Sequence, residues 1–208
     1  MKKTSKLIIL CAMIISCLAL VGCGEDKEAI AKEKAKEFIE ITGQMNDNST
    51  MIMATISGLC EKWDKYPENG IQCAQNMLKV INTQSIDGMA GWGTSIETLF
   101  WKTDYDIEND ADKQIVVEQC LTFQELYASI SDYDTKAYEL LQDIKNYDEK
   151  VYDDLKEYYL ASSNYGETAL AFSTIEISTS STYSYFERAN EDITKVVELR
   201  ERVELDYK

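Results

Sequence analysis

The sequence predicts an all-α protein, an elongated antiparallel four-helix bundle with long helices. Its 208 residues contain a single proline, Pro67, and proline is the residue that most strongly breaks helices. Apolar residues, which make up 45% of the chain, recur at spacings of three and four over long segments, as on the buried face of a helix. This apolar content is too high for a disordered chain.

The first predicted hairpin consists of two helices. The first covers residues 25 to 65, and its apolar positions step by three and four: Ala31, Phe38, Ile41, Met45, Ile52 and Leu59. Residues 66 to 70, Tyr-Pro-Glu-Asn-Gly, form the clearest turn signal in the chain. The second helix is predicted over residues 71 to 101. An antiparallel arrangement about this turn pairs Leu59 with Ala74, Ile52 with Ile81 and Asn48 with Ser85.

The same arrangement places Cys60 opposite Cys73. Cysteines at matching heights beside a turn can reach the Cα separation that a disulfide needs, ~4.4–6.8 Å. We therefore predict a disulfide between Cys60 and Cys73, with two buried thiols as the alternative. Cys120 is left over as an unpaired cysteine.

The second predicted hairpin follows an acidic connection over residues 102 to 112. A helix over residues 111 to 145 carries a strict heptad, and the pattern resumes at Glu149 after a weak turn at residues 146 to 148. Antiparallel pairing about Tyr147 matches Ile144 with Val151 and Phe123 with Phe172. The alternative is an uninterrupted helix, which would show the same phase. The hydroxyl-rich run 178–182 then interrupts the pattern. A further C-terminal helical segment, residues 183 to 205, has Phe186, Ile193, Val197 and Val203 on one side. This segment must either overhang the bundle or fold back.

Residues 1 to 22 have the pattern of an export signal. An uncharged apolar run covers residues 7 to 21 and follows Lys2, Lys3 and Lys6. This run is shorter than the ~20 apolar residues that a transmembrane helix needs. The run ends in Leu20-Val21-Gly22-Cys23, which resembles the lipobox of bacterial lipoproteins. The resemblance implies cleavage before Cys23, which would then carry a diacylglycerol. The alternative is an ordinary secretory signal followed by a chance cysteine.

This resemblance sets the predicted domain organisation: a signal peptide (1–22), a lipid-anchored tether (23–30) and one helical bundle domain (31–208). Two acyl chains are enough for stable anchoring. We expect the mature protein on the extracytoplasmic face of a cell membrane. The low proline content, the absent histidine and the use of Lys, Asn and Ile are typical of an AT-rich, Gram-positive bacterium.

The charge of the chain excludes some partners. Three of its 21 basic residues and none of its 37 acidic residues lie in the signal, so the rest of the chain has a formal net charge of −19. Such a charge disfavours nucleic acid. The chain has no histidine, which removes the commonest general base and metal ligand. With no glycine-rich phosphate loop and no zinc spacing, we predict no catalytic residue, no cofactor and no metal site, and hence no enzyme.

Three features are candidate binding sites. The middle of the first hairpin is small and polar, so Asn48, Ser85 and Trp92 could line a small-ligand site or a layer that fixes register. The acidic connection has alternating carboxylates but lacks the glycine and glutamate of an EF-hand, which favours a solvated capping loop. Tyrosines outside the heptad, such as Tyr127, Tyr138 and Tyr159, could form an interface or be ordinary partly buried residues.

Two functions remain open from the sequence. The first is a protein-interaction or structural module of the cell envelope, with an envelope protein or a second copy as partner. The second is a ligand- or cation-binding sensor or capture lipoprotein that uses the mid-bundle polar layer or the acidic connection.

Overall fold

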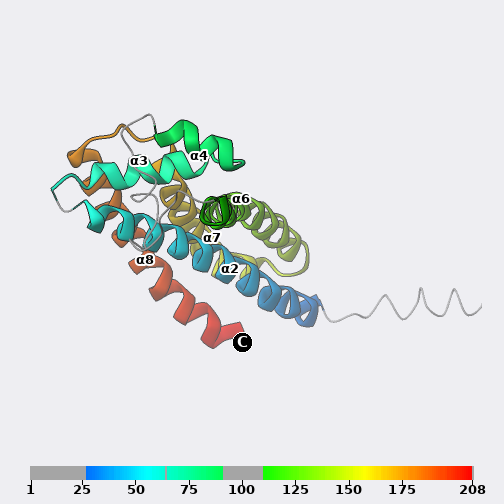
Figure 1. The fold of residues 1–208 in the computed structure, drawn as a ribbon. Coiled ribbons are helices and arrows are strands. Elements are labelled where there is room, and N and C mark those ends of the chain that lie inside the picture. The colour runs from blue at the N-terminus through cyan, green and yellow to red at the C-terminus, as the bar shows by residue number, and fades with distance from the viewer. Residues whose placement is uncertain (1–26, 64, 91–109, 208) are drawn as a thin grey trace, which may run out of the picture.

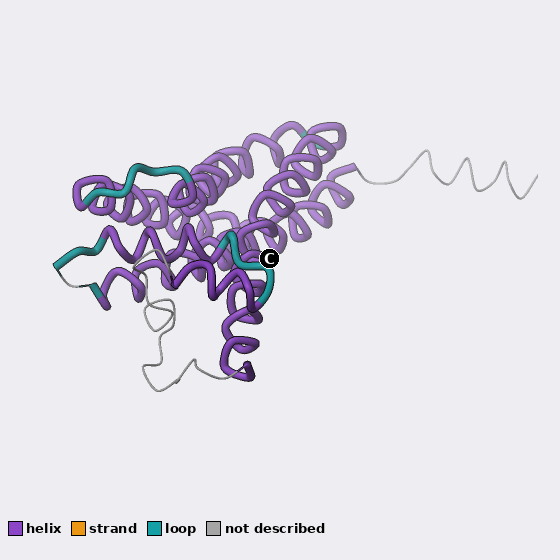
Figure 2. Tube along the Cα trace, turned by 45° about the horizontal axis from the view of Figure 1, so that its top comes forward, coloured by secondary structure: helices purple, strands orange, loops and turns teal. Residues whose placement is uncertain are grey.

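The computed structural model describes residues 27–63, 65–90 and 110–207. Within these residues the predicted all-α fold is confirmed: helices pack side by side in an elongated bundle and none of the described residues lies in a strand (Figures 1 and 2). Helix α2 (Lys27–Lys62) runs through the bundle and contacts α6 (Asp110–Tyr147), α7 (Glu149–Leu170) and α8 (Thr179–Tyr207). Helix α2 begins at Lys27, so the last part of the predicted tether is helical.

The predicted second helix over 71–101 is wrong over the residues that the structure describes. The chain there forms two short helices, α3 (Glu68–Met77) and α4 (Thr83–Ala90). The break is stabilised from another helix, because the Gln124 side-chain amide of α6 donates to the carbonyls of Met77 and Val80 at 2.8 and 2.7 Å. The Asn82 side chain then accepts from the Ser85 backbone N–H at 3.1 Å, as an N-cap does for the next helix.

The predicted register of the first hairpin therefore holds only near the turn. Leu59 and Ala74 are buried in the same core cluster, and α2 contacts α3. Beyond the break, α4 contacts α6. The middle of α2 bonds instead to α6 and α7, because Asn48 donates to Ser129 and Asn46 donates to Ser162.

The second hairpin forms as predicted. Helices α6 and α7 meet at Asp148, whose carboxylate accepts from the backbone N–H groups of Lys150 and Val151 at 2.9 and 3.2 Å. The predicted pair Phe123 and Phe172 is in contact, with ring centroids 5.7 Å apart. The heptad and the weak turn at residues 146 to 148 thus predicted the hairpin and its register, and the structure adds Asp148 as the N-cap of α7.

The C-terminal segment folds back. Helix α7 ends at Leu170 and is followed by a short 3₁₀ turn, η1 (Ala171–Ser173), and a connection to α8. Thr168 of α7 donates to Asp192, and Tyr207 donates to Asp154, so α8 runs antiparallel to α7 along its length. Its last turns lie at the same end of the bundle as the start of α2 (Figure 1).

Two hydrophobic clusters make up the core. One, around Phe38, Leu155 and Val196, occupies the half of the bundle that holds the start of α2, and the other, around Ile56, Ile71 and Phe172, occupies the half that holds α3. Met53 packs against both clusters. No helix in the described part of the chain is long and apolar enough to cross a membrane.

Candidate functional site

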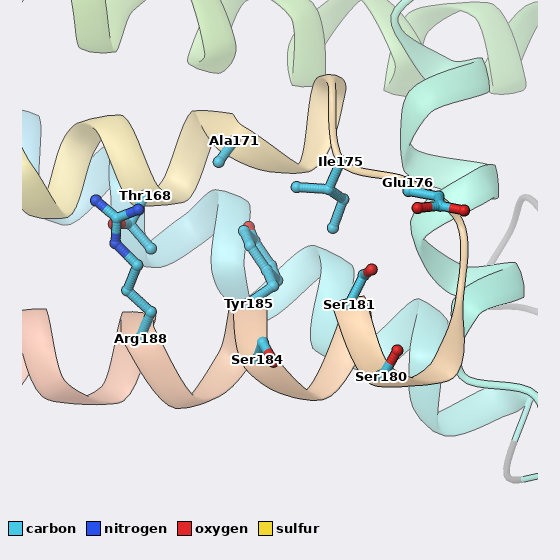
Figure 3. A pocket seen from close by; sticks show the side chains of 9 residues that line it. All are labelled: Thr168, Ala171, Ile175, Glu176, Ser180, Ser181, Ser184, Tyr185 and Arg188. Carbon is cyan, nitrogen blue, oxygen red and sulfur yellow. The ribbon is translucent and has the colours of Figure 1, made fainter.

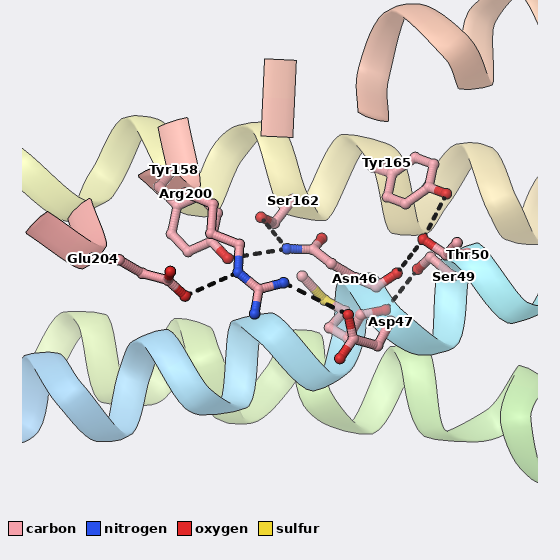
Figure 4. Close-up of polar contacts among 10 residues, drawn as sticks. Asn46, Asp47, Ser49, Thr50, Tyr158, Ser162, Tyr165, Arg200 and Glu204 are labelled. Carbon is pink, nitrogen blue, oxygen red and sulfur yellow. Dashed lines mark hydrogen bonds and ion pairs between the residues drawn. The ribbon is translucent and has the colours of Figure 1, made fainter. Parts of the chain in front are cut away.

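A buried polar layer crosses the bundle between the two hydrophobic clusters (Figure 4). Its centre is Asn46 of α2, which is 2% exposed and donates from its side-chain amide to Tyr158 and Ser162 of α7 at 3.1 and 3.0 Å. One turn along α2, the Thr50 hydroxyl shares a hydrogen bond of 3.1 Å with the Tyr165 hydroxyl. These bonds fix the register of α2 against α7, because a shift along the axis would leave buried polar groups unpaired.

Helix α8 joins this layer through Arg200. Its guanidinium lies 3.0 Å from Glu204 and 3.6 Å from Asp47 of α2. The guanidinium lies over Gly43 of α2, where a Cβ would make an ordinary contact of 3.6 Å with one of its nitrogens. The hydrogen bond with Glu204 is the main reason that the pKa of Arg200 is raised, so this cation remains charged.

Two oxygens in the same layer have no hydrogen-bond partner among the described residues: Thr42 Oγ1 and Asn46 Oδ1. Burial raises the pKa of both Tyr158 and Tyr165, so neither hydroxyl can act as a base near neutral pH. No group of histidine, cysteine or carboxylate side chains in the described residues could hold a metal ion. The described side chains of the layer can therefore position the helices through hydrogen bonds.

The structure describes two of the three predicted ligand-binding residues, and these two have different partners. Asn48 donates to Ser129 of α6 at 2.8 Å, whereas Ser85 bonds to Asn82 beside the start of α4. Trp92 and most of the acidic connection lie outside the described residues. The polar stretch of α2 was recognised from the sequence, but its partners are Tyr158, Ser162 and Tyr165 of α7.

The cysteines require a correction. Cys60, Cys73 and Cys120 are buried thiols, so the structure holds the predicted Cys60–Cys73 pair without a disulfide. The hairpin turn does bring α3 close to Cys60, whose sulfur lies against the backbone of Gly70 and Ile71. Burial raises the pKa of both Cys60 and Cys120 to about 12, from an ordinary value of 9.0.

We expect the folded protein to lose stability as the pH rises above about 9. Between about pH 9 and 12 an unfolded chain releases the thiol protons that the folded chain retains at Cys60 and Cys120. Each thiol then lowers the free energy of unfolding by at most about 1.4 kcal/mol per pH unit. Urea unfolding at several pH values in reductant should show this decline, and Cys120→Ala should make it shallower. An unchanged slope in Cys120→Ala would contradict the assignment.

The tyrosines predicted as interface residues differ from one another. Tyr127 contacts Phe172 and bonds to Ser173 at 3.1 Å, so it belongs to the packing of α6 on η1. Tyr138 is exposed and rests against the partly buried Tyr159, with ring centroids 5.9 Å apart. Only Tyr138 offers a large exposed aromatic surface among these three.

Helix α8 carries two stripes of side chains. Its inner stripe faces α7 and α2 and is buried: Thr182, Tyr185, Ala189, Val196, Leu199 and Val203. We call the second the outer stripe: Tyr183, Phe186, Asn190, Ile193 and Val197. The Tyr183 and Val197 side chains are 63% and 48% exposed, and Phe186 and Ile193 pack at the edges of the two clusters. The sequence placed Phe186, Ile193, Val197 and Val203 on one side, whereas the structure buries Val203 in the inner stripe and leaves Val197 exposed.

Two hollows flank the first half of α8. One, of about 460 Å³, lies between the end of α7 and α8, with Ser180, Ser181 and Ser184 along it and Glu176 and Arg188 toward opposite ends (Figure 3). The other, of about 260 Å³, lies between α2 and α8 and is lined by Ser57, Glu61, Pro67, Tyr183 and Phe186, with Cys60 and Thr182 behind them.

Comparisons of the chain with protein-family models, with curated proteins and with solved structures give no match.

Proposed function

We propose that this chain is a lipid-anchored protein-interaction module of the cell envelope, held on the extracytoplasmic face of the membrane through Cys23. The lipobox-like Leu20-Val21-Gly22-Cys23 supports the anchor. The outer stripe of α8 supports the interaction, and it is the observation that carries the proposal. Tyr183 and Val197 stay exposed although α8 has already buried its inner stripe and packs Phe186 and Ile193 at the edges of the core. Large apolar side chains left exposed in one line are typical of an interface.

The anchor gives a direct prediction. Cys23→Ala removes the sulfur that would carry the diacylglycerol, so we expect the precursor to remain uncleaved and incorporation of labelled palmitate to be lost. Globomycin, which inhibits the lipoprotein signal peptidase, should likewise block cleavage of the unaltered chain. Processing and palmitate labelling that continue in Cys23→Ala would contradict the anchor, and Cys17→Ala provides the matched control because that cysteine lies within the signal.

Photo-crosslinking in intact cells tests the interaction. A photo-reactive amino acid in place of Val197 lies in the outer stripe, whereas the same residue in place of Leu160, which is 50% exposed on α7, provides a matched control. We expect one dominant envelope protein to be captured from position 197 and not from position 160. Equal capture at both positions, or none at either, would reject the interaction module.

The hollow between α7 and α8 favours a second candidate function, capture of a small polar ligand. Its hydroxyl groups and the opposite charges of Glu176 and Arg188 suit a ligand that carries both charges. A thermal-shift screen of amino acids and short peptides tests this function. A hit should disappear in Arg188→Ala and persist in Arg202→Ala, and the absence of any hit would reject it.

A further inference from the structure

We propose that the outer stripe of α8, together with the hollow at its α2 side, binds an amphipathic helix of an envelope protein whose flanks carry lysine and arginine. This inference rests on the proposed function and names the class of partner. Three observations support it: the spacing of the stripe, the position of the hollow and the distribution of charge around both.

The spacing of the outer stripe is that of a coiled-coil seam. Tyr183, Phe186, Asn190, Ile193 and Val197 alternate steps of three and four, which keeps side chains on one line along a supercoiling helix. The line from Tyr183 to Val197 is about 21 Å long at 1.5 Å per residue. Such a seam suits a second helix better than an extended strand, because knobs on one helix fit between the side chains of the other.

Asn190 gives this seam a polar centre. It is exposed and lies midway between Tyr183 and Val197. A single asparagine in an otherwise apolar seam costs stability but selects the partner and its register, because the partner must place a polar group opposite it. The partner helix should therefore carry one polar residue within its apolar stripe.

The hollow lies at the N-terminal end of the seam. Its volume is about 260 Å³, and Tyr183 and Phe186 of the seam form one wall, opposite Ser57, Glu61 and Pro67. An interface gains most of its affinity from a few large side chains seated in such depressions. The hollow is the expected position of an apolar anchor residue of the partner.

The charge around the seam selects a basic partner. Glu61 borders the hollow, and Glu187, Glu198 and Glu201 are exposed beside the seam on α8. Two arginines of α8 form ion pairs away from the seam. Arg202 pairs with Glu157 of α7 at 3.0 Å, and Arg188 lies 3.8 Å from Asp192 of α8 itself.

The arginine that lies between α8 and α2, Arg200, also has acidic partners. Arg200 lies 3.0 Å from Glu204 and 3.6 Å from Asp47. The border of the seam is thus acidic. A second copy of this chain, with a formal net charge of −16 over its full sequence, would bring like charges together, whereas lysine and arginine flanks would complement the seam.

The test uses the full lipidated chain in phosphatidylcholine nanodiscs, with empty nanodiscs as the blank. The probe is a synthetic helix of three heptads with leucine in its stripe, one central asparagine and lysine on its flanks. The control peptide has glutamate in place of every lysine. We expect the lysine peptide to bind at least about tenfold more tightly, with an affinity that falls as salt is raised.

Variants locate the binding. Val197→Glu places a charge in the seam at a half-exposed position and should weaken binding of the lysine peptide at least about tenfold, while Leu160→Glu on α7 should leave it unchanged. Glu187→Lys combined with Glu201→Lys reverses the border charge at exposed positions, so it should weaken the lysine peptide and strengthen the glutamate peptide. Asp153→Lys combined with Glu167→Lys, at two exposed positions of α7, is the matched control.

The outcomes separate this inference from the proposed function. Three results would overturn the inference that the partner is a basic helix. They are equal binding of both peptides, no binding of either, and an affinity for the lysine peptide that is unchanged by Val197→Glu and by Glu187→Lys combined with Glu201→Lys. If position 197 still crosslinks one envelope protein in cells, the interaction module stands and only the class of partner is wrong. Crosslinks from position 197 to a second copy alone would overturn the inference in favour of a homo-oligomer. A captured partner segment with a lysine- and arginine-flanked apolar stripe, together with the lysine preference, would support both.

Discussion

Phe172→Ala should destabilise the protein by about 3 to 5 kcal/mol, the usual cost of removing a buried phenylalanine ring. Phe172 is fully buried after the end of α7, with ring centroids 5.7 Å from Phe123 and 5.8 Å from Tyr127. Its loss leaves a cavity between α6 and η1 that the aromatic partners cannot fill without leaving their own contacts. Urea unfolding followed by circular dichroism at 222 nm measures the change.

The control for Phe172→Ala is Tyr66→Ala, which removes an aromatic ring that is 60% exposed beside the α2–α3 turn. We expect this variant to change the free energy of unfolding by less than about 0.5 kcal/mol. If Phe172→Ala were as mild as Tyr66→Ala, the packing of η1 on α6, and with it the register of the second hairpin, would be wrong.

Gly70→Ala is the second substitution with a large expected effect. A Cβ at residue 70 would overlap the backbone nitrogen of Cys60 and lie 2.6 Å from its Cα and 2.7 Å from its sulfur. These backbone atoms cannot move aside as the end of a flexible side chain can, so α3 must shift away from α2. We expect a loss of about 3 kcal/mol, at the upper end of the usual cost of overpacking, measured by the same urea unfolding.

Two other buried glycines of the chain provide controls of graded severity. At Gly166 a Cβ would lie 3.1 Å from a methyl group of Ile130, which can shift, and at Gly43 it would make an ordinary contact of 3.6 Å with Arg200. Gly166→Ala should cost less than Gly70→Ala. Gly43→Ala should be neutral or stabilising by up to about 1 kcal/mol, because alanine favours helix over glycine. An equal effect at residues 43 and 70 would show that α3 does not rest on Cys60.

The candidate site was only partly predictable. The polar stretch of α2 around Asn46 and Asn48 stands out in the sequence because polar residues there interrupt an apolar face. Its true partners, Tyr158 and Ser162, lie 112 and 116 residues away, and no local pattern connects them. The sequence grouped Phe186, Ile193 and Val197 of α8 with Val203, which the structure buries in the inner stripe, because the sequence of a helix cannot say which of two stripes the core will bury.

The sequence by itself determined the helices whose evidence is local. One proline, long three-and-four periodicity and the turn at residues 146 to 148 act within a few turns of helix, and they determined the all-α class and the α6–α7 hairpin with its Phe123–Phe172 pair. The lipobox-like segment is local in the same sense, and the anchor predicted from it remains a proposal.

The tertiary structure alone decided the rest. The break between α3 and α4 depends on Gln124, 44 to 47 residues away, which binds the carbonyls of Met77 and Val80. The return of α8 along α7 depends on burial of its inner stripe and on the hydrogen bond from Thr168 to Asp192. A helical pattern shows which faces are apolar, but not which of them is buried or which neighbour buries it. That choice is made by the hydrogen bonds and packing between elements, whose free energies exceed the small differences in local helix propensity.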